Sequence, residues 1–387
     1  MRKETLLTRV GREMAGSGPV NPAVQRASTI RFDTVAEFER AQRDRYERGT
    51  LYYGTYGTET TFAFESAVAA LEGGDAAIAV SSGLAAIVAT ISAFVGSGEH
   101  LLVPDSVYGP VRIACEGVLR RAGIETTYYD PLAGSEIVAQ IRPNTKLLYL
   151  ESPGSLTFEV QDVPAIVAVA KQHGISTALD NTWATGYYFD AFARGVDVVI
   201  QAATKYVGGH SDLVLGAIVT TQAHYERMRR TVAGLGYSAA PDDCWLALRG
   251  LRTLPVRLRA HAERAIAVAS YLDGRPEVEL VLYPRLAGAP GHALWKRDFT
   301  GATGLFSFVF ERTIPESAAI AFVERLRLFA IGASWGGYES LALLVRPKAI
   351  RSLPTWQDTG SIVRLQIGLE DAADLVDDLK NAFSTLS

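Results

Sequence analysis

The stretch Ile200-Gln201-Ala202-Ala203-Thr204-Lys205-Tyr206-Val207-Gly208-Gly209-His210-Ser211-Asp212 decides the interpretation of the fold. The apolar run 196–200 that leads into it predicts a buried strand, which ends in small polar residues, one lysine and a glycine pair. A lysine at the end of a buried strand is costly, because its charge loses water. Burial also lowers the pKa of the amine, which makes it a better nucleophile and base. A rim lysine that extends to water is the alternative, and Lys205 taken alone favours it.

A second stretch favours a reactive, buried Lys205 over a rim lysine. Residues 175–179 are another short apolar run, which ends in Asp180 and continues as Asn181-Thr182-Trp183. In a parallel sheet, two adjacent strand ends can present an aspartate and a lysine to one crevice. A Schiff-base lysine and a carboxylate facing a pyridinium nitrogen are what pyridoxal phosphate (PLP) requires. The two stretches together predict a PLP site.

The chain around these stretches alternates between helices and strands. We expect strands at 76–80, 101–103, 124–128, 147–150, 175–179 and 213–220, and helices at 62–71, 84–94, 111–121 and 163–173. This pattern predicts an α/β fold with a large, mostly parallel sheet that helices cover on both faces. Ligands bind at the carboxyl ends of such strands, which is where Ser82, Asp180 and Lys205 fall.

Three regions are expected along the chain. Residues 1–60 predict an arm, because 51–58 is rich in tyrosine, glycine and threonine and would lie across another subunit. Residues 61–250 form the PLP-binding domain. Residues 251–387 form a smaller α+β domain, with a long helix at 251–272, strands at 305–310 and 362–367, and helices at 317–328 and 372–383.

Composition excludes several classes of function. The 387 residues are 48% hydrophobic and 21% charged, which is ordinary for a globular protein. A net charge of −4 gives no basic patch for nucleic acid. Cys115 and Cys244 cannot form a disulfide framework, and no Cys/His pair has metal-site spacing. Without a signal-peptide pattern or an apolar run of membrane length, we expect a cytoplasmic protein with no membrane, nucleic-acid or metal partner.

Four further sites carry candidate chemistry, each with a simpler alternative. Ser81-Ser82-Gly83-Leu84, between a strand and a helix, predicts N–H groups that bind phosphate, or else a plain turn. Tyr108 could stack on a pyridine ring or pack at a helix start. Arg364, inside an apolar strand, needs a partner, either a substrate carboxylate or a structural ion pair. The loop 334–340 could shape a pocket or only a turn.

Together these residues resemble the PLP-dependent Cys/Met-metabolism family of fold type I over nearly the whole chain. The stretches that carry the resemblance are Glu151-Ser152-Pro153-Gly154-Ser155, Asp180-Asn181-Thr182-Trp183, Ala202-Ala203-Thr204-Lys205-Tyr206, Gly250-Leu251-Arg252-Thr253-Leu254, Trp295-Lys296-Arg297-Asp298-Phe299-Thr300-Gly301, Ser334-Trp335-Gly336-Gly337-Tyr338-Glu339-Ser340 and Ile367-Gly368-Leu369-Glu370-Asp371. Their number and order make the resemblance specific. It implies a seven-stranded large sheet, and Trp335 resembles the β-lyase version of its loop.

The resemblance also implies roles for residues around the cofactor. Lys205 would form the Schiff base and move the Cα proton, while Asp180 would pair with the pyridine nitrogen. Tyr108 would stack on the ring, and the phosphate would be held by backbone N–H groups of Gly83 and Leu84, with Thr204.

The substrate and the neighbouring subunit are implied in the same way. Arg364 would hold the substrate α-carboxylate, with Ser334 and Trp335 lining that site. Tyr53 would reach the phosphate of a neighbouring subunit and tune the incoming amine, so the expected catalytic residues are Lys205, Tyr108 and Tyr53. A site completed in this way implies self-association, and the family is usually a homotetramer built as a dimer of dimers.

The chain departs from the family pattern at three positions. Thr55 stands where the arm carries a phosphate-binding arginine, which predicts weaker cofactor binding. Ala233 and Ile113 stand where bacterial β-lyases carry a tyrosine and an aspartate near the far end of the substrate. Arg112, beside Ile113, would then favour an anionic or otherwise different distal group.

The predicted function is a PLP-dependent carbon–sulfur β-lyase that converts L-cystathionine, or a related S-substituted cysteine, into a thiol, pyruvate and ammonia. One alternative is a lyase or γ-replacement enzyme of the same family with another amino-acid substrate. Another is a PLP-binding protein that has lost turnover, against which the presence of Lys205, Asp180 and Arg364 argues.

Overall fold

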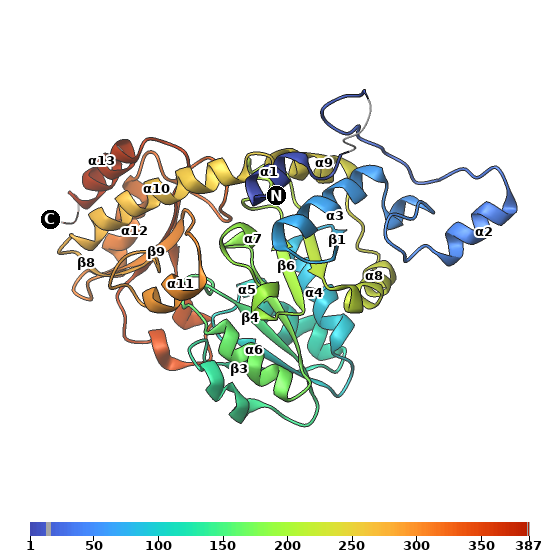
Figure 1. The fold of residues 1–387 in the computed structure, drawn as a ribbon. Helices are drawn as coiled ribbons and strands as arrows, with labels where there is room; N and C mark the ends of the chain where they lie inside the picture. Colours follow the sequence, from blue (N-terminus) through green and yellow to red (C-terminus); the bar gives the residue numbers. More distant parts are fainter. Residues whose placement is uncertain (13–16, 385, 387) are drawn as a thin grey trace.

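The computed structural model describes residues 1–12, 17–384 and 386, and two β-sheets organise it (Figure 1). The larger sheet has seven strands in the order β1-β7-β6-β5-β4-β2-β3, and the smaller has five in the order β10-β11-β12-β9-β8. The predicted α/β fold with a seven-stranded, mostly parallel sheet is therefore confirmed.

The large sheet is parallel except at one strand. Its strands are β1 (Ala76–Val80), β2 (His100–Pro104), β3 (Glu125–Tyr129), β4 (Thr145–Glu151), β5 (Ser176–Asp180), β6 (Val198–Ala202) and β7 (Gly216–Thr220). Strand β7 pairs antiparallel with both β6 and β1. No helix lies between β6 and β7 to carry the chain back across the sheet, so β7 returns in the opposite direction.

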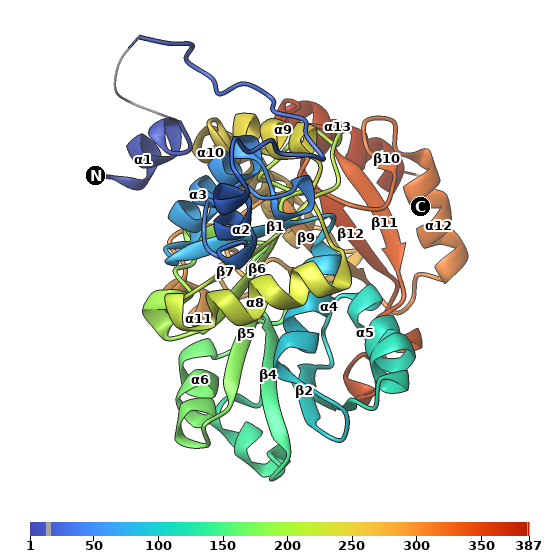
Figure 2. The ribbon, with the colours of Figure 1, turned by 90° about the vertical axis from the view of Figure 1, so that its right-hand side faces the viewer.

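Alternation along β1 shows why this sheet is buried on both faces. Ala77 and Ala79 pack into one apolar core, whereas Ile78 and Val80 pack into a second core on the opposite face. Buried strands of this kind are continuous apolar runs, which is why the sequence revealed them. The covering helices are α3 (Glu59–Glu72), α4 (Gly83–Phe94), α5 (Gly109–Ala114), α6 (Val163–Gln172), α7 (Thr185–Tyr188), α8 (Gln222–Leu235) and α9 (Pro241–Leu251), and Figure 2 looks onto α4, α5 and α8.

One predicted helix is interrupted. The region 111–121 was expected to be a single helix, but α5 ends at Ala114 and a π-helical turn, η2 (Cys115–Leu119), follows. Gly117 inside that turn lowers the cost of leaving α-helical geometry, because it has no side chain to restrict the backbone.

The smaller sheet forms the second half of the molecule. It comprises β8 (Val278–Leu282), β9 (Leu305–Phe310), β10 (Ala330–Ile331), β11 (Leu341–Val345) and β12 (Ile362–Gln366), covered by α10 (Leu254–Asp273), α11 (His292–Asp298), α12 (Glu316–Arg325) and α13 (Ala372–Phe383). Strands β8, β10 and β11 were missed, because they are short or partly exposed. One apolar core touches both sheets, and the boundary at residues 250 and 251 stays a prediction.

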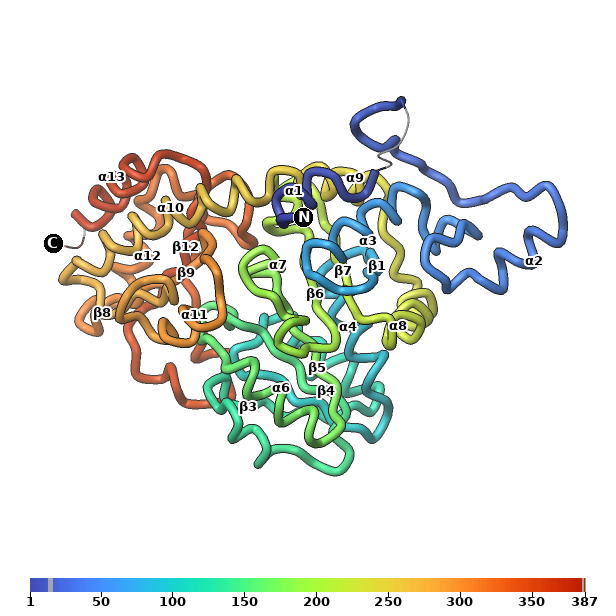
Figure 3. The backbone as a smooth tube through the Cα atoms, in the orientation of Figure 1, coloured from blue at the N-terminus to red at the C-terminus, as the bar shows by residue number. Residues whose placement is uncertain are grey.

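Much of the segment 17–60 extends away from the body of the protein before the chain returns to it (Figure 3). Helix α1 (Lys3–Arg9) packs beside α3 and buries Leu7 completely. The following segment carries α2 (Val35–Arg43) and the short turn η1 (Gly54–Tyr56), and it projects from one side in Figure 1. Residues 13–16 of the predicted arm, and residues 385 and 387 of the predicted C-terminal domain, lie outside the described residues.

Among the described residues, no helix combines the length and apolarity that a membrane span needs. The same residues hold no group of three or more His, Cys, Asp or Glu side chains arranged to bind a metal ion.

Candidate active site

Five strand ends of the large sheet surround one cavity of about 210 Å³. Residues that follow or end β1, β2, β4, β5 and β6 line it, and it is closed by Arg364 of β12 and by Trp335 from the loop between β10 and β11. Eight predicted site residues line this cavity: Gly83, Leu84, Tyr108, Asp180, Thr204, Lys205, Trp335 and Arg364. The α/β topology therefore brings together residues that lie far apart in the sequence.

Lys205 points into the cavity. Its Nζ donates a hydrogen bond to Ser334 Oγ at 2.6 Å and lies 5.2 Å from the centre of the Trp335 ring. Burial, followed by the positive charge of Arg364, lowers the pKa of Lys205 to about 8. The Nζ is thus bonded at the cavity wall, and the lowered pKa leaves part of this amine neutral near physiological pH.

Two carboxyl groups lie side by side at the floor of the cavity. Asp180 ends β5 directly opposite Glu151, which ends β4. Burial raises the pKa of both groups, and the charge of Asp180 raises that of Glu151 further. Asp180 accepts a hydrogen bond from the Thr182 N–H at 2.9 Å, and Glu151 accepts one from the Tyr108 N–H at 2.8 Å. Because two adjacent negative charges repel each other, the pair favours one charged and one neutral carboxyl. A cation bound beside Asp180 would make Asp180 the charged member of the pair.

The start of α4 forms a cradle for an anion. Ser82 caps this helix by accepting the Ala85 N–H at 3.0 Å, and its carbonyl accepts the Ala86 N–H. Gly83 and Leu84 are left as first-turn N–H groups without an acceptor among the described residues. A Cβ at Gly83 would lie 2.7 Å from the Cβ of Ala202, so this close approach requires glycine.

Thr204 stands beside this cradle, but its hydroxyl is already engaged. It donates to the Leu215 carbonyl at 3.2 Å and accepts the Leu215 N–H at 3.0 Å. A phosphate oxygen accepts hydrogen bonds, so Thr204 would have to give up its carbonyl partner to donate to one. Ser82 offers the simpler donor, because its oxygen accepts from Ala85 while its own O–H is free to turn into the cavity.

Arg364 is available to a carboxylate. Its Nη2 donates to the Ser334 carbonyl at 3.1 Å, and burial lowers its pKa. Within the part of the chain that the structure describes, it has no carboxylate partner, so the alternative of a structural ion pair is wrong. Ser334 adopts a left-handed backbone with φ +82°, an unfavourable conformation for a residue with a side chain. That conformation aims both its carbonyl and its hydroxyl at the two cations of the site.

The predicted distal residues lie elsewhere in this subunit. Arg112 is buried and pairs with Asp105 at 2.6 Å, so the expectation that it binds a distal substrate group is wrong. Ile113 is 72% exposed, and Ala233 lines a separate small pocket together with Thr55. Tyr53 is also outside the cavity, on the arm, and its predicted role stays a prediction that depends on a second subunit.

Sequence reasoning assigned no role to two features of this site, Glu151 and the loop 153–158. Both line the cavity, the loop through Pro153, Gly154, Ser155, Leu156 and Phe158. Glu151 and the start of that loop belong to a motif that carried the family resemblance. The signal that could have found Glu151 is an acidic residue at the end of an apolar strand, the same signal that found Asp180.

Comparison with known proteins identifies the family. The sequence pattern of the Cys/Met metabolism PLP-dependent enzymes matches residues 4–384. The chain belongs to this family. A cystathionine β-lyase from Bordetella avium is 46% identical over 371 residues, which cover 95% of this chain and 92% of that protein.

Two further relatives agree with this placement. The cystathionine β-lyase MetC of Escherichia coli is 42% identical over 389 residues, covering 99% of this chain and 98% of its own. The crystal structure of metB from Corynebacterium glutamicum superimposes with a TM-score of 0.91 at 30% identity and covers 100% of this chain and 99% of that one.

The residues present fit the cofactor of this family. The acceptor-free N–H groups of Gly83 and Leu84 suit a phosphate, and the buried carboxyl of Asp180 suits a protonated ring nitrogen. When bound, PLP withdraws electrons from the Cα of an amino acid. Tyr108, 42% exposed at the cavity wall, offers a ring face for stacking.

The chain itself supplies the remaining chemistry. Arg364 can bind an α-carboxylate bidentately, which fixes one end of an amino acid in the cavity. Ser334 holds the Nζ of Lys205 at the same place, so the neutral amine can take a proton from Cα and return it elsewhere. Trp335 and Tyr108 give this end of the cavity apolar walls that limit access of water.

Proposed function

We propose that this protein is a carbon–sulfur β-lyase that acts on L-cystathionine or a related S-substituted L-cysteine. The observation that carries the proposal is that Lys205, Arg364 and Asp180 line one cavity, while Ser334 accepts hydrogen bonds from both Lys205 and Arg364. Relatives named cystathionine β-lyase, 46% and 42% identical over most of the chain, support the choice among the reactions of the family.

The reaction balances as follows. Lys205 removes the proton from Cα, the Cβ–S bond breaks, and the sulfur leaves with the bonding electrons as a thiolate. The protonated lysine can then return a proton to the leaving thiolate. Water then hydrolyses the remaining three-carbon fragment to pyruvate and ammonia. With L-cystathionine the thiol is homocysteine.

Product analysis tests this function. L-cystathionine, L-cystine, L-cysteine and an S-alkyl-L-cysteine are offered separately to the PLP-loaded protein, and pyruvate and 2-oxobutyrate are measured. Pyruvate is expected, because β-elimination gives pyruvate whereas γ-elimination gives 2-oxobutyrate. Release of 2-oxobutyrate alone, or elimination at full rate by Lys205→Ala, would refute the proposal. Pyruvate from the other substrates but not from cystathionine would place the enzyme among cysteine-conjugate lyases.

We further propose that the arm completes the active site of a second subunit and that the protein assembles as a homotetramer in the cytoplasm. Tyr53 is 45% exposed on the arm, away from the cavity of its own chain, which suits a residue that acts on a neighbour. Mixing Tyr53→Phe with Lys205→Ala subunits tests this arrangement. Random pairing gives intact sites at about a quarter of the positions, so activity should return. Light scattering separately measures the number of subunits.

A further inference from the structure

One wall of the cavity is a loop with an unusual backbone. Residues 154–159 follow β4, and within them Leu156 has φ +70° and Phe158 has φ +58°. Both residues line the cavity. The left-handed conformation is unfavourable for residues with large side chains, so the surroundings must hold the loop in place. Positions of this kind concentrate where a binding surface depends on them.

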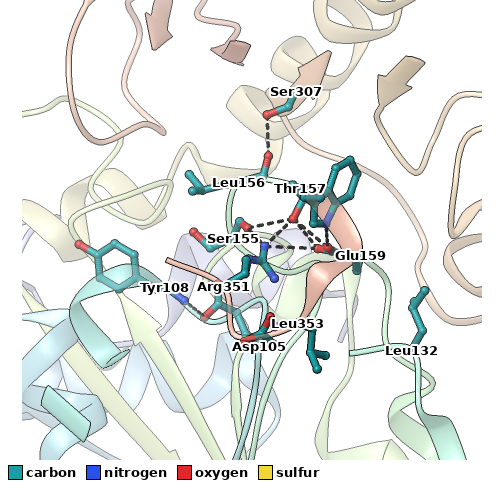
Figure 4. Close-up of polar contacts among 12 residues, drawn as sticks. Asp105, Tyr108, Leu132, Ser155, Leu156, Thr157, Glu159, Ser307, Arg351 and Leu353 are labelled. Atoms are coloured by element: carbon teal, nitrogen blue, oxygen red, sulfur yellow. Dashed lines mark hydrogen bonds and ion pairs between the residues drawn. The ribbon is translucent and has the colours of Figure 1, made fainter. Parts of the chain in front are cut away.

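The side chain that holds this loop comes from the other half of the molecule. Arg351 Nη2 donates to the Ser155 carbonyl at 2.9 Å and to Thr157 Oγ1 at 2.5 Å, and it lies 3.8 Å from Glu159 Oε2 (Figure 4). Its side chain is only 4% exposed. The Trp356 indole N–H adds a bond to Glu159 Oε1 at 2.9 Å. Arg351 therefore binds the loop on both sides of the strained Leu156.

The same segment also holds the neighbouring turn after β2. The N–H groups of Ser352 and Leu353 donate to the carboxylate of Asp105 at 2.8 and 3.1 Å. Asp105 follows β2 and begins the turn that leads to Tyr108. We call residues 351–356, which include the short turn η6 (Pro354–Trp356), the bridging segment. It connects the loop 154–159 and the turn that begins at Asp105 to the half of the protein that carries Arg364.

We propose that Arg351 is a positioning residue of the active site, which keeps the loop 154–159 in the conformation that Leu156 and Phe158 need to form the substrate-binding wall. The kinetic part of this proposal rests on the β-lyase function proposed above. Arg351 does not touch the reacting atoms. It acts through the Ser155 carbonyl and the Thr157 hydroxyl, which both accept hydrogen bonds from Nη2 at the far end of the guanidinium. A lysine side chain is shorter, so its ammonium would reach these two acceptors less well.

A purely structural role makes a different prediction. If Arg351 only stabilised the fold, its loss would lower thermal stability and cofactor content together with activity. A positioning role predicts a local change, because Ser352 and Leu353 still tie the bridging segment to Asp105 when the Arg351 side chain is lost. The loop would loosen and substrate affinity would fall, while the chemistry at Lys205 would be largely retained.

The test compares three variants of the PLP-loaded enzyme. Arg351→Met removes the guanidinium, and Arg351→Lys keeps a charge on a shorter side chain. Arg346→Met is the matched control, since Arg346 lies just before the bridging segment, is half exposed and pairs with Glu316 on the surface. Hydrogen–deuterium exchange of the peptide that contains residues 154–159 measures the loop without any substrate. Steady-state kinetics with the best substrate of the wild type separate KM from kcat.

The expected result for Arg351→Met is faster exchange in the loop peptide and a KM raised at least roughly tenfold, as for the loss of a buried charged hydrogen bond, with kcat within about threefold of wild type. Arg351→Lys should be intermediate, and Arg346→Met should match the wild type. Unchanged exchange in Arg351→Met, or a loss of melting temperature and cofactor in parallel with activity, would overturn the proposal. If the wild type released no pyruvate, the β-lyase function would fail, while the exchange measurement would still decide whether Arg351 holds the loop.

Discussion

The lowered pKa of Lys205 can be measured directly. Desolvation is its main cause, and the charge of Arg364 is the second. Lowering the pKa from 10.5 to about 8 raises the neutral fraction of this amine at pH 7 from about 0.03% to about 9%, roughly 300-fold. Only the neutral amine is a nucleophile, so the lowered pKa increases the reactive fraction of Lys205 before any ligand binds.

Competitive labelling of the cofactor-free protein with trace acetic anhydride measures this fraction. Mass spectrometry follows acetylation of Lys205 against pH, with the exposed Lys348 as the internal reference. Labelling of Lys205 should reach half of its plateau near pH 8. Arg364→Met removes the nearby positive charge, so it should raise the pKa and shift that midpoint to higher pH. A midpoint near 10.5 in the wild type, or no shift in Arg364→Met, would refute the electrostatic reasoning.

Three further predictions concern stability, each followed by urea unfolding at fixed cofactor content. Phe308→Ala should cost about 3–5 kcal/mol, because Phe308 is fully buried among aromatic rings of the small-sheet core, and a loss below about 1 kcal/mol would contradict that packing. Asp371→Ala should lower the free energy of unfolding by about 1 kcal/mol, because it removes the side chain that caps α13, whereas Asp371→Ser should keep most of that stability. Burial raises the pKa of Glu72 from 4.5 to about 7, so the folded state holds its proton more tightly than the unfolded state. The stabilisation that this proton gives is fully present below pH 4.5. As the pH rises to about 7, the free energy of unfolding therefore falls by about 3 kcal/mol. The difference in stability between Glu72→Gln and the wild type should therefore change between pH 5 and 8, and a constant difference would disprove this assignment.

Much of the fold could be predicted because buried elements leave local signals. The strand 76–80 and the helix 372–383 coincide with β1 and α13, since an apolar run and an amphipathic repeat are both properties of a short window. The direction of β7 had no such signal. That direction depends on the strands with which β7 pairs, and on the absence of a crossover helix between β6 and β7.

Some residues of the candidate site likewise have a local signal in the sequence, whereas others depend on the folded structure. Lys205 and Asp180 were found because a charged residue at the end of an apolar strand is anomalous within its own stretch. Arg112 misled the sequence interpretation, since its partner Asp105 and its bond to Ser352 become visible only when the chain is folded. Glu151 carries the same local signal as Asp180 and was overlooked, whereas its position directly opposite Asp180 depends on the register between β4 and β5 and could not be predicted.

The sequence by itself determined the α/β class and the PLP-dependent family, and it singled out Lys205, Asp180 and Arg364 as candidate site residues, because residue type and local pattern carry that information. Tertiary structure decided which of the charged side chains are free to bind ligands. Arg364 has no carboxylate partner among the described residues, whereas Arg112 is paired and Arg351 holds a loop 196 residues earlier in the chain. Contacts across such distances follow from the packing of the two sheets, which places remote segments side by side and which no short window of sequence contains.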